Sequence, residues 1–291
     1  MSESPPWLSS VEASGLPAKA RRLAELSRAG LPVPRGLVLS PSAAALDDPT
    51  VASAVAELLR HGPVVVRSAL AGEDEAEGSA AGLARSRLGC EEVSAVRQAL
   101  AELATQRDDP WLVAYRQHGG AGSPDRAIVQ QEVPRRALLV VAVPPEGGAE
   151  IEVHAASGEA LAEGRSPDYA GLLRHWNDPA REPVEALVDR TVAILPPAEH
   201  GHDLELVVAE DGEVWLVQAR PLAAPLHPGW AEFREALARD DRRPDLHGTL
   251  TLDAEHNPAP LSPAHAWLCR WLAEQRPLQA PLRVLAGFLY E

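Results

Sequence analysis

The sequence predicts an α+β protein with a largely antiparallel sheet. Three consecutive valines, Val64–Val66, are typical of a strand that is buried on both faces. Apolar residues across Val184–Leu195 recur at the spacing of one helix face. Asp211 and Gly212 lie between two strand-forming runs and indicate a β-hairpin. Strand and helix patterns mix without a strict βαβ alternation, which favours the α+β class.

Further elements follow from the same periodicities and from the turn residues between them. The helix Pro17–Arg28 has a proline in its first turn and Gly30 just past its end. Ala71–Gly89 is rich in Gly, Ala, Ser and acidic residues and predicts a mobile loop. The other predicted elements are the apolar run Leu37–Leu39, the helices Val51–Arg60 and Glu92–Gln106, and the strands Pro63–Arg67, Ala127–Val133, Ala137–Val143 and Glu150–His154.

Composition narrows the class of protein. A formal net charge of −15 argues against a nucleic-acid partner, because phosphate backbones favour Lys and Arg. Cys90 and Cys269 are the two cysteines, and neither a disulfide framework nor a zinc spacing follows from them. The first residues lack a basic and apolar signal sequence, and no apolar run is long enough to span a bilayer. We therefore expect a cytoplasmic protein without a membrane partner.

One lysine stands out. Of the 27 basic side chains only Lys19 is a lysine, and the others are arginines. A compact ammonium group is not equivalent to a guanidinium, and phosphate binding is one task that suits it. The alternative is the chance survival of a single lysine.

The hairpin around Asp211 and Gly212 gathers polar residues at its open end. A two-residue type I′ turn pairs Glu210 with Glu213, and the alternation of faces then fixes the other pairs. The predicted core face carries Leu204, Leu206, Val208, Trp215, Val217 and Ala219, with Val208 opposite Trp215, and the predicted polar face carries Asp203 opposite Arg220 and Glu205 opposite Gln218.

Two interpretations of this polar face are open. Two carboxylates and an amide oxygen are hard donors of the kind that Mg²⁺ accepts beside a nucleotide phosphate. Arg220 next to them can hold a phosphate oxygen. The alternative is a solvated hairpin face with a cross-strand pair between Asp203 and Arg220.

A second candidate lies at the end of the valine strand. Arg67 is followed by a loop of small residues, so a guanidinium and backbone N–H groups can approach a polyphosphate there. The alternative is an arginine at a strand end that extends into solvent before a loop.

Five stretches in the same order resemble the nucleotide-binding unit of phosphoenolpyruvate synthase and pyruvate, phosphate dikinase. Rifampicin phosphotransferase is another relative with this unit. The last of the five, Asp-Leu-Glu followed by Val-Gln-Ala-Arg-Pro, is highly specific. The stretches are Gly15–Ala43, Arg67–Gly82, Ala127–Val133, Ser157–Asp168 and Asp203–Pro221.

The resemblance implies an ATP-grasp fold of two lobes that bind ATP. Lys19 and Arg67 would contact the phosphates, with Arg220 reaching a further phosphate oxygen. Glu132 and Val133 would present the backbone of a hinge to adenine. These phosphate-binding residues, Lys19, Arg67 and Arg220, would also be the catalytic ones.

The resemblance also implies a magnesium ion. Glu205 and Gln218 would hold Mg²⁺, with Asp203 beside them. One further phosphate-binding arginine of the family has no clear counterpart, because the stretch around it is missing, and Arg107 and Arg116 are the candidates. Other departures are Pro17-Ala18 in place of Gly-Gly before the lysine, Ala69 in place of a serine, and Glu132 in place of a methionine.

The function implied is that of a Mg-ATP-binding module of a dikinase-type phosphotransferase. Such enzymes form AMP and pass a phosphoryl group to a histidine on a swivelling domain. None of the ten histidines lies in the family's Thr-Ser-His setting, and the nearest, His265, fits a surface residue at a helix start. We therefore expect the carrier domain in trans or downstream. The alternatives are a non-catalytic nucleotide-binding regulatory or interaction module and a relative that binds nothing.

The domain organisation follows from the same comparison. Residues 1–126 would form the first lobe with its phosphate-binding loop, and residues 127–222 the second lobe with its metal-binding hairpin. Residues 223–291 begin with a Pro- and Ala-rich linker and would form a helical connector.

Overall fold

The computed structural model describes most of the chain before residue 227 and parts of the rest. Residues 71–85 of the predicted loop, the stretch 156–166, Arg107, Arg116 and much of the connector expected at 223–291 lie outside the described residues. None of the helices it describes is long and apolar enough to cross a membrane. The described residues are 4–70, 86–106, 125–145, 147–155, 167–226, 253, 257, 260–275, 283–285 and 287–290.

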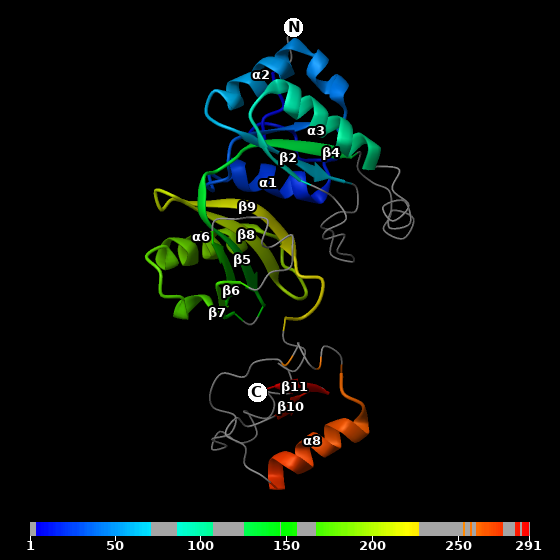
Figure 1. Ribbon diagram of the computed structural model, residues 1–291, viewed down its shortest axis with the longest axis vertical. Coiled ribbons are helices and arrows are strands. Elements are labelled where there is room, and N and C mark those ends of the chain that lie inside the picture. The colour runs from blue at the N-terminus through cyan, green and yellow to red at the C-terminus, as the bar shows by residue number, and fades with distance from the viewer. Residues whose placement is uncertain are drawn as a thin grey trace. The chain divides into compact units, whose positions relative to one another are not determined.

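The chain divides into two compact units, Met1–Ala224 and Pro225–Glu291. The first unit holds two antiparallel sheets, which confirms the predicted α+β class. Its first sheet has the strand order β1-β4-β2-β3, and its second the order β7-β6-β5-β8-β9. The chain passes from the first sheet to the second once, between β4 and β5 (Figure 1).

The first sheet consists of β1 (Gly36–Leu39), β4 (Arg126–Gln131), β2 (Val64–Ala69) and β3 (Arg87–Cys90). Helices α2 (Pro49–Leu59) and α3 (Val93–Gln106) cover one of its faces, and a short 3₁₀ helix, Ala43–Asp47, precedes α2 (Figure 1). The loop predicted at Ala71–Gly89 is wrong at its end, because Arg87–Gly89 belong to β3, which pairs with β2.

Alternation along β2 decides where its arginine points. Val64 and Val66 pack with α2 and α3 in one hydrophobic cluster, whereas Ala69 belongs to the cluster shared with the second sheet. Because neighbouring residues of a strand point to opposite faces, Arg67 shares the face of Ala69. Arg67 is therefore directed away from α2 and α3, toward the second sheet.

Helix α1 (Ala18–Arg28) lies between the two sheets. It contacts β2 of the first sheet and β9 of the second (Figure 1). Pro17 immediately precedes it with φ −55°, and Gly30 follows it with φ +76°, as expected from a proline at the start and a glycine after the end. Its buried residues include Leu23 and Leu26, which belong to the larger hydrophobic cluster of the unit.

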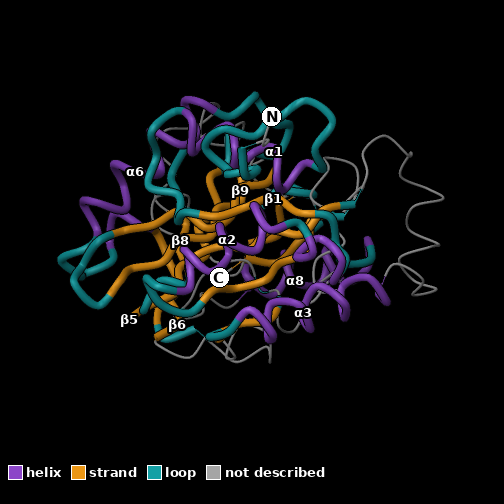
Figure 2. Tube along the Cα trace, turned by 90° about the horizontal axis from the view of Figure 1, so that it is seen from above, coloured by secondary structure: helices purple, strands orange, loops and turns teal. Residues whose placement is uncertain are grey.

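The second sheet consists of β7 (Tyr169–Leu172), β6 (Glu150–Ala155), β5 (Arg135–Val143), β8 (His202–Ala209) and β9 (Val214–Pro221). Helix α6 (Arg181–Ile194) contacts β9 and lies on the outside of this sheet (Figure 2). It buries Val184, Leu187 and Val188 in the larger cluster, as its periodicity predicted. One face of the sheet is thereby closed.

The change of sheet does not fall where the sequence placed the lobe boundary. β4 was assigned to the second lobe, but it pairs with β1 and β2 in the first sheet. The connection between the sheets is the short segment Glu132–Pro134, which ends where β5 begins.

The second unit is small. Its helix α8 (Pro263–Gln275) contacts the hairpin of β10 (Arg283–Leu285) and β11 (Phe288–Tyr290). A minor apolar cluster includes Val284 and Leu289.

Candidate functional site

The hairpin that joins β8 and β9 has a longer turn than predicted. The N–H group of Gly212 donates to the carbonyl of Ala209 at 3.0 Å, and Gly212 has φ +91°. This is a three-residue loop that ends in a left-handed glycine instead of a two-residue type I′ turn. As a result Val208 pairs with Val214, and the predicted pair with Trp215 is wrong.

A β-bulge then restores the predicted register at the open end. Leu206 pairs with Leu216, whereas Glu205 pairs with Gln218, so Val217 is the extra residue on β9. Beyond it Asp203 lies opposite Arg220, as predicted. The two deviations of one residue cancel, and the polar cluster forms as the sequence indicated.

The shift changes which residues of β9 reach the core. Leu216 is fully buried in the larger hydrophobic cluster, whereas Trp215 and Val217 are only half-buried. The predicted core positions of Trp215 and Val217 are therefore wrong. Because Trp215 is paired with Val207 and alternates with Leu216, it lies on the polar face that carries Glu205 and Gln218.

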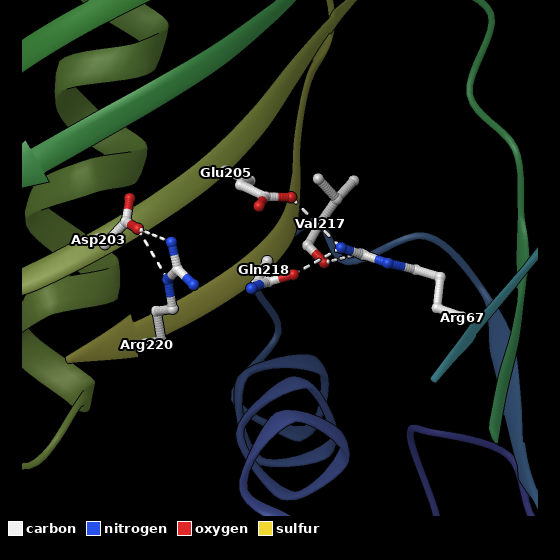
Figure 3. A network of polar contacts seen from close by, with 6 residues as sticks. All are labelled: Arg67, Asp203, Glu205, Val217, Gln218 and Arg220. Carbon is white, nitrogen blue, oxygen red and sulfur yellow. Dashed lines mark hydrogen bonds and ion pairs between the residues drawn. The ribbon is translucent and has the colours of Figure 1, made fainter. Parts of the chain in front are cut away.

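Arg67 of the first sheet reaches across to this polar face (Figure 3). Its Nη2 donates to Oε1 of Gln218 at 2.6 Å and lies 3.3 Å from Oε2 of Glu205. Its Nη1 donates to the carbonyl of Val217, the residue that the bulge removes from regular pairing. The side chain of Arg67 is 10% exposed, so this charge is neutralised and hydrogen-bonded within the protein.

A second ion pair lies further along the same hairpin. Nε and Nη2 of Arg220 approach Oδ2 of Asp203 at 2.8 and 2.6 Å (Figure 3). The other oxygen of Asp203, Oδ1, is buried and has no hydrogen-bond partner in the part of the chain that the structure describes. Burial raises the pKa of the Asp203 carboxyl, Arg220 lowers it, and Glu205 and Glu152 raise it further.

The polar face continues across the sheet with acidic residues. Glu152 on β6 and Glu205 on β8 lie opposite the same residue of β5, Val140, so they occupy one row with Gln218. The next row holds Glu150, Ala142, Asp203 and Arg220. Four carboxylates therefore lie on this face with the guanidinium groups of Arg67 and Arg220, which makes it suited to hold cations.

The hinge between the sheets borders a cavity of about 610 Å³. Trp215, Glu132 and Val133 lie in its wall. A volume of this size is typical of small-molecule sites. The remaining lining residues are Pro34, Arg35, His61, Gln131, Pro134, Ala209, Glu210, Asp211 and Glu213.

The hinge offers a limited set of backbone groups to a ligand. The N–H group of Glu132 donates to the carbonyl of Pro63 at 3.0 Å, and its carboxylate accepts from the N–H group of Gly89 at 2.7 Å. Pro134 has no N–H group. Within the described ranges, the N–H group of Val133 makes no hydrogen bond. This donor and the carbonyl of Glu132 are therefore the hinge groups that can pair with a base.

Lys19 is placed near the cluster by its helix. It lies in the first turn of α1 and is 7% exposed. The same helix contacts β2, which carries Arg67, and β9, which carries Gln218. Lysine is rarely buried in proteins unless its charge is paired with another group.

The oxygen atoms on the polar face are of the type that magnesium binds, but they are fewer than its usual number of ligands. Glu205, Gln218 and Asp203 carry hard oxygen donors on one face. Across the described residues, no three His, Cys, Asp or Glu side chains are arranged to hold a metal ion. Mg²⁺ prefers about six oxygen ligands, so further oxygens from a ligand or from water are needed.

Sequence reasoning missed two features of the site. It placed Trp215 in the core, although a Glu-Asp-Gly turn is also compatible with a three-residue loop that moves this residue to the other face. It gave no role to Glu152, whose position opposite Val140 appears only once β6 is paired with β5.

No family model matches the sequence, and no curated protein does so. Solved structures that match include the L-amino acid ligase from Bacillus licheniformis, with a TM-score of 0.45 and 12% identity over 71% of this chain and 43% of that one. Carboxyaminoimidazole ribonucleotide synthase from Aspergillus clavatus, complexed with ATP, has a TM-score of 0.41 and 14% identity over 70% of this chain and 44% of that one.

The ATP-grasp ligase PsnB, complexed with a minimal precursor, matches with a TM-score of 0.40 and 15% identity over 74% of this chain and 55% of that one. The chain thus spans less than half the length of the first two proteins and about half of the third. Because all three TM-scores are below 0.5, the proposals below rest on the residues of this chain.

Proposed function

We propose that the chain binds Mg-ATP between its two sheets and is the nucleotide-binding part of an ATP-dependent phosphotransferase of the dikinase type. The observation that carries the proposal is the contact of Arg67, from the first sheet, with Glu205 and Gln218 of the second. It brings a guanidinium group next to a carboxylate and an amide oxygen, and the family resemblance implies phosphate binding for the first and metal binding for the other two.

The base of ATP fits the cavity at the hinge. The carbonyl of Glu132 can accept from the amino group of adenine, and the N–H group of Val133 can donate to a ring nitrogen. Trp215 in the cavity wall offers an aromatic surface on which a base can stack. The acidic lining, which includes Glu210 and Glu213, favours a base with an amino group over one with an exposed carbonyl.

The phosphates fit the adjacent part of the same face. Gln218 lies three residues along β9 from Trp215, a separation of about 10 Å at the rise of an extended strand. A nucleotide with its base at the hinge would therefore place its phosphates beside Arg67 and the metal donors. Lys19 on α1 and Arg220 would add positive charge to the phosphate-binding end.

Glu205, Gln218 and Asp203 would hold Mg²⁺, which would neutralise negative charge on the phosphates. Catalysis by this chain would consist of positioning the phosphates with Arg67, Lys19 and Arg220 and of stabilising charge in the transition state. The phosphoryl group would pass to a histidine on a separate carrier domain with AMP as the other product, as in the enzymes that the sequence resembles.

The metal assignment predicts a specific result for Glu205→Ala. In the presence of Mg²⁺ this substitution should weaken ATP binding at least about tenfold, or ~1.4 kcal/mol. In EDTA it should have no weakening effect, because the lost carboxylate then only repels phosphate. Isothermal titration calorimetry with and without Mg²⁺ measures both values.

The control for this measurement is Glu182→Ala. The side chain of Glu182 is 83% exposed on α6, outside the polar face, so its loss should leave both affinities unchanged. An equal loss of affinity with and without metal in Glu205→Ala would show that Glu205 has a structural role and would contradict the assignment.

A further inference from the structure

We infer that Arg67 makes metal binding depend on nucleotide. In the ATP-free protein its guanidinium group occupies the oxygens that a divalent metal ion would use, and it leaves them when phosphates arrive. The inference rests on the proposed function, since it assigns a second role to a residue of that site.

The contacts of Arg67 are those of a cation in a cation site. It binds a carboxylate oxygen of Glu205, the amide oxygen of Gln218 and the backbone oxygen of Val217. A guanidinium group has five N–H donors and no acceptor, so it uses oxygen ligands as a metal ion does. Two of these three oxygens, those of Glu205 and Gln218, are the donors assigned to Mg²⁺.

The surroundings make the arginine hard to displace by metal alone. Arg67 is 10% exposed on its side chain, and a buried charge that loses its partners is strongly destabilising. The protein also offers few replacement ligands, since no three acidic or histidine side chains within the described residues are arranged around a metal position. A metal ion without nucleotide would therefore gain few protein ligands in exchange for its water and would leave Arg67 unpaired.

Nucleotide removes both obstacles in one exchange. Phosphate oxygens can accept two parallel hydrogen bonds from a guanidinium group, so Arg67 regains a counter-charge of equal quality. The same phosphates supply oxygens to complete the metal shell. Glu205 exchanges Arg67 for the metal, and Arg67 exchanges Glu205 for phosphate, so no charge is left unpaired.

The bulge gives the arginine its third ligand. Because Val217 has no partner in the register of β8, its carbonyl is directed outside regular pairing and accepts from Nη1 of Arg67. A regular hairpin would use this oxygen in the ladder. The same irregularity that brings Glu205 opposite Gln218 therefore also holds Arg67 over them.

The inference is tested with Mn²⁺ alone, as a paramagnetic substitute for Mg²⁺, in the absence of nucleotide. Electron paramagnetic resonance of free Mn²⁺ gives its affinity for the whole chain. Arg67→Met, which removes the charge but keeps much of the side-chain volume, should bind Mn²⁺ about tenfold or more tightly than the wild type, in the range of typical coupling between sites. Arg67→Lys should give an intermediate value, because one ammonium group cannot cover all three oxygens.

Two further proteins make the result specific. The double variant Arg67→Met, Glu205→Ala should lose the gained affinity, since it lacks the carboxylate. Arg87→Met removes an arginine of β3 that pairs with Glu102 of α3, outside the site, and should match the wild type. Circular dichroism shows whether each variant is folded. If Arg67→Met does not fold, the comparison of Arg67→Lys with the wild type still tests the inference.

Equal Mn²⁺ affinity in wild type, Arg67→Met and Arg67→Lys would overturn the inference, as would a gain that persists in the double variant. The proposed function is tested separately by the binding of Mg-ATP to the wild type. Failure of that binding would contradict the nucleotide site whatever Mn²⁺ does, whereas normal ATP binding with equal Mn²⁺ affinities would contradict the role of Arg67 alone.

Discussion

Arg67→Met and Lys19→Ala should each abolish transfer of the β-phosphoryl group of ATP to a histidine domain supplied in trans. The loss of rate should be about 10³-fold or more, because removing a cation that stabilises a transferring phosphoryl group costs about 10³–10⁵-fold in related chemistry. Positioning adds to this effect, since a correctly held acceptor can account for about 7–11 kcal/mol of a barrier. Arg67 is the one basic residue of β2.

The measurement uses ATP labelled at the β-phosphate, with AMP formation followed in the same samples. Without the carrier domain the chain should show little steady turnover. Arg97→Met is the matched control, because this arginine pairs with Asp47 on the outer side of the first sheet and should leave the rate unchanged. If ATP binds well but no histidine domain ever acquires label, the phosphotransferase role fails and a regulatory nucleotide-binding module takes its place.

Gly201→Ala should destabilise the fold by about 3–5 kcal/mol, near the upper end for single substitutions. Gly201 has φ +92°, and an added Cβ atom would lie 2.0 Å from the carbonyl oxygen of Val143 and 2.8 Å from Cα of Pro144. Both neighbours are backbone atoms, so the strands must separate. The residue directly precedes β8, and the displacement would pass to Asp203 and Glu205.

Gly212→Ala is the control that isolates the clash from the backbone strain. Gly212 has nearly the same φ, +91°, but an added Cβ would meet nothing within 4 Å. Its cost should be about 1–2 kcal/mol, the typical cost of a left-handed conformation in a residue with a side chain. Denaturant unfolding of both variants measures the two free energies of unfolding. Equal destabilisation would show that Val143 and Pro144 move aside without a loss of stability, and it would contradict the predicted clash.

Local patterns predicted most elements of the first unit correctly. The helices at Ala18–Arg28, Val93–Gln106 and Arg181–Ile194 follow from periodicity and end signals that act within a few residues. The hairpin residues Glu205 and Gln218 were paired correctly although the turn was not, because the bulge at Val217 compensates for the longer loop. The prediction therefore reached the right pairs through a wrong turn type.

The contact of Arg67 with Glu205 could not be read from one sequence. The two residues are 138 positions apart and belong to different sheets, so their meeting depends on how the sheets pack on α1. Local rules identified both as polar residues on strands and left solvated alternatives open for each. In the structure Arg67 is buried on the face of β2 that is directed toward the second sheet, so its side chain does not extend into solvent.

The predicted position of Trp215 was wrong for a different reason. The faces of a strand alternate with a period of two, so an error of one residue in a turn moves every later side chain to the opposite face until a bulge corrects it. Trp215 and Leu216 lie between the turn and the bulge, and they exchanged places relative to the prediction. This exchange placed an aromatic side chain in the wall of the hinge cavity.

Calorimetric titration of the full chain with Mg-ATP tests the central claim most directly. We expect one ATP per chain, weaker binding of Mg-GTP, and a loss of about 1–3 kcal/mol of binding free energy in Trp215→Ala, the usual contribution of stacking by a base. Trp271→Ala, which removes a tryptophan exposed on α8 in the second unit, should bind like the wild type. A folded protein that shows neither heat nor thermal stabilisation with Mg-ATP would contradict the account.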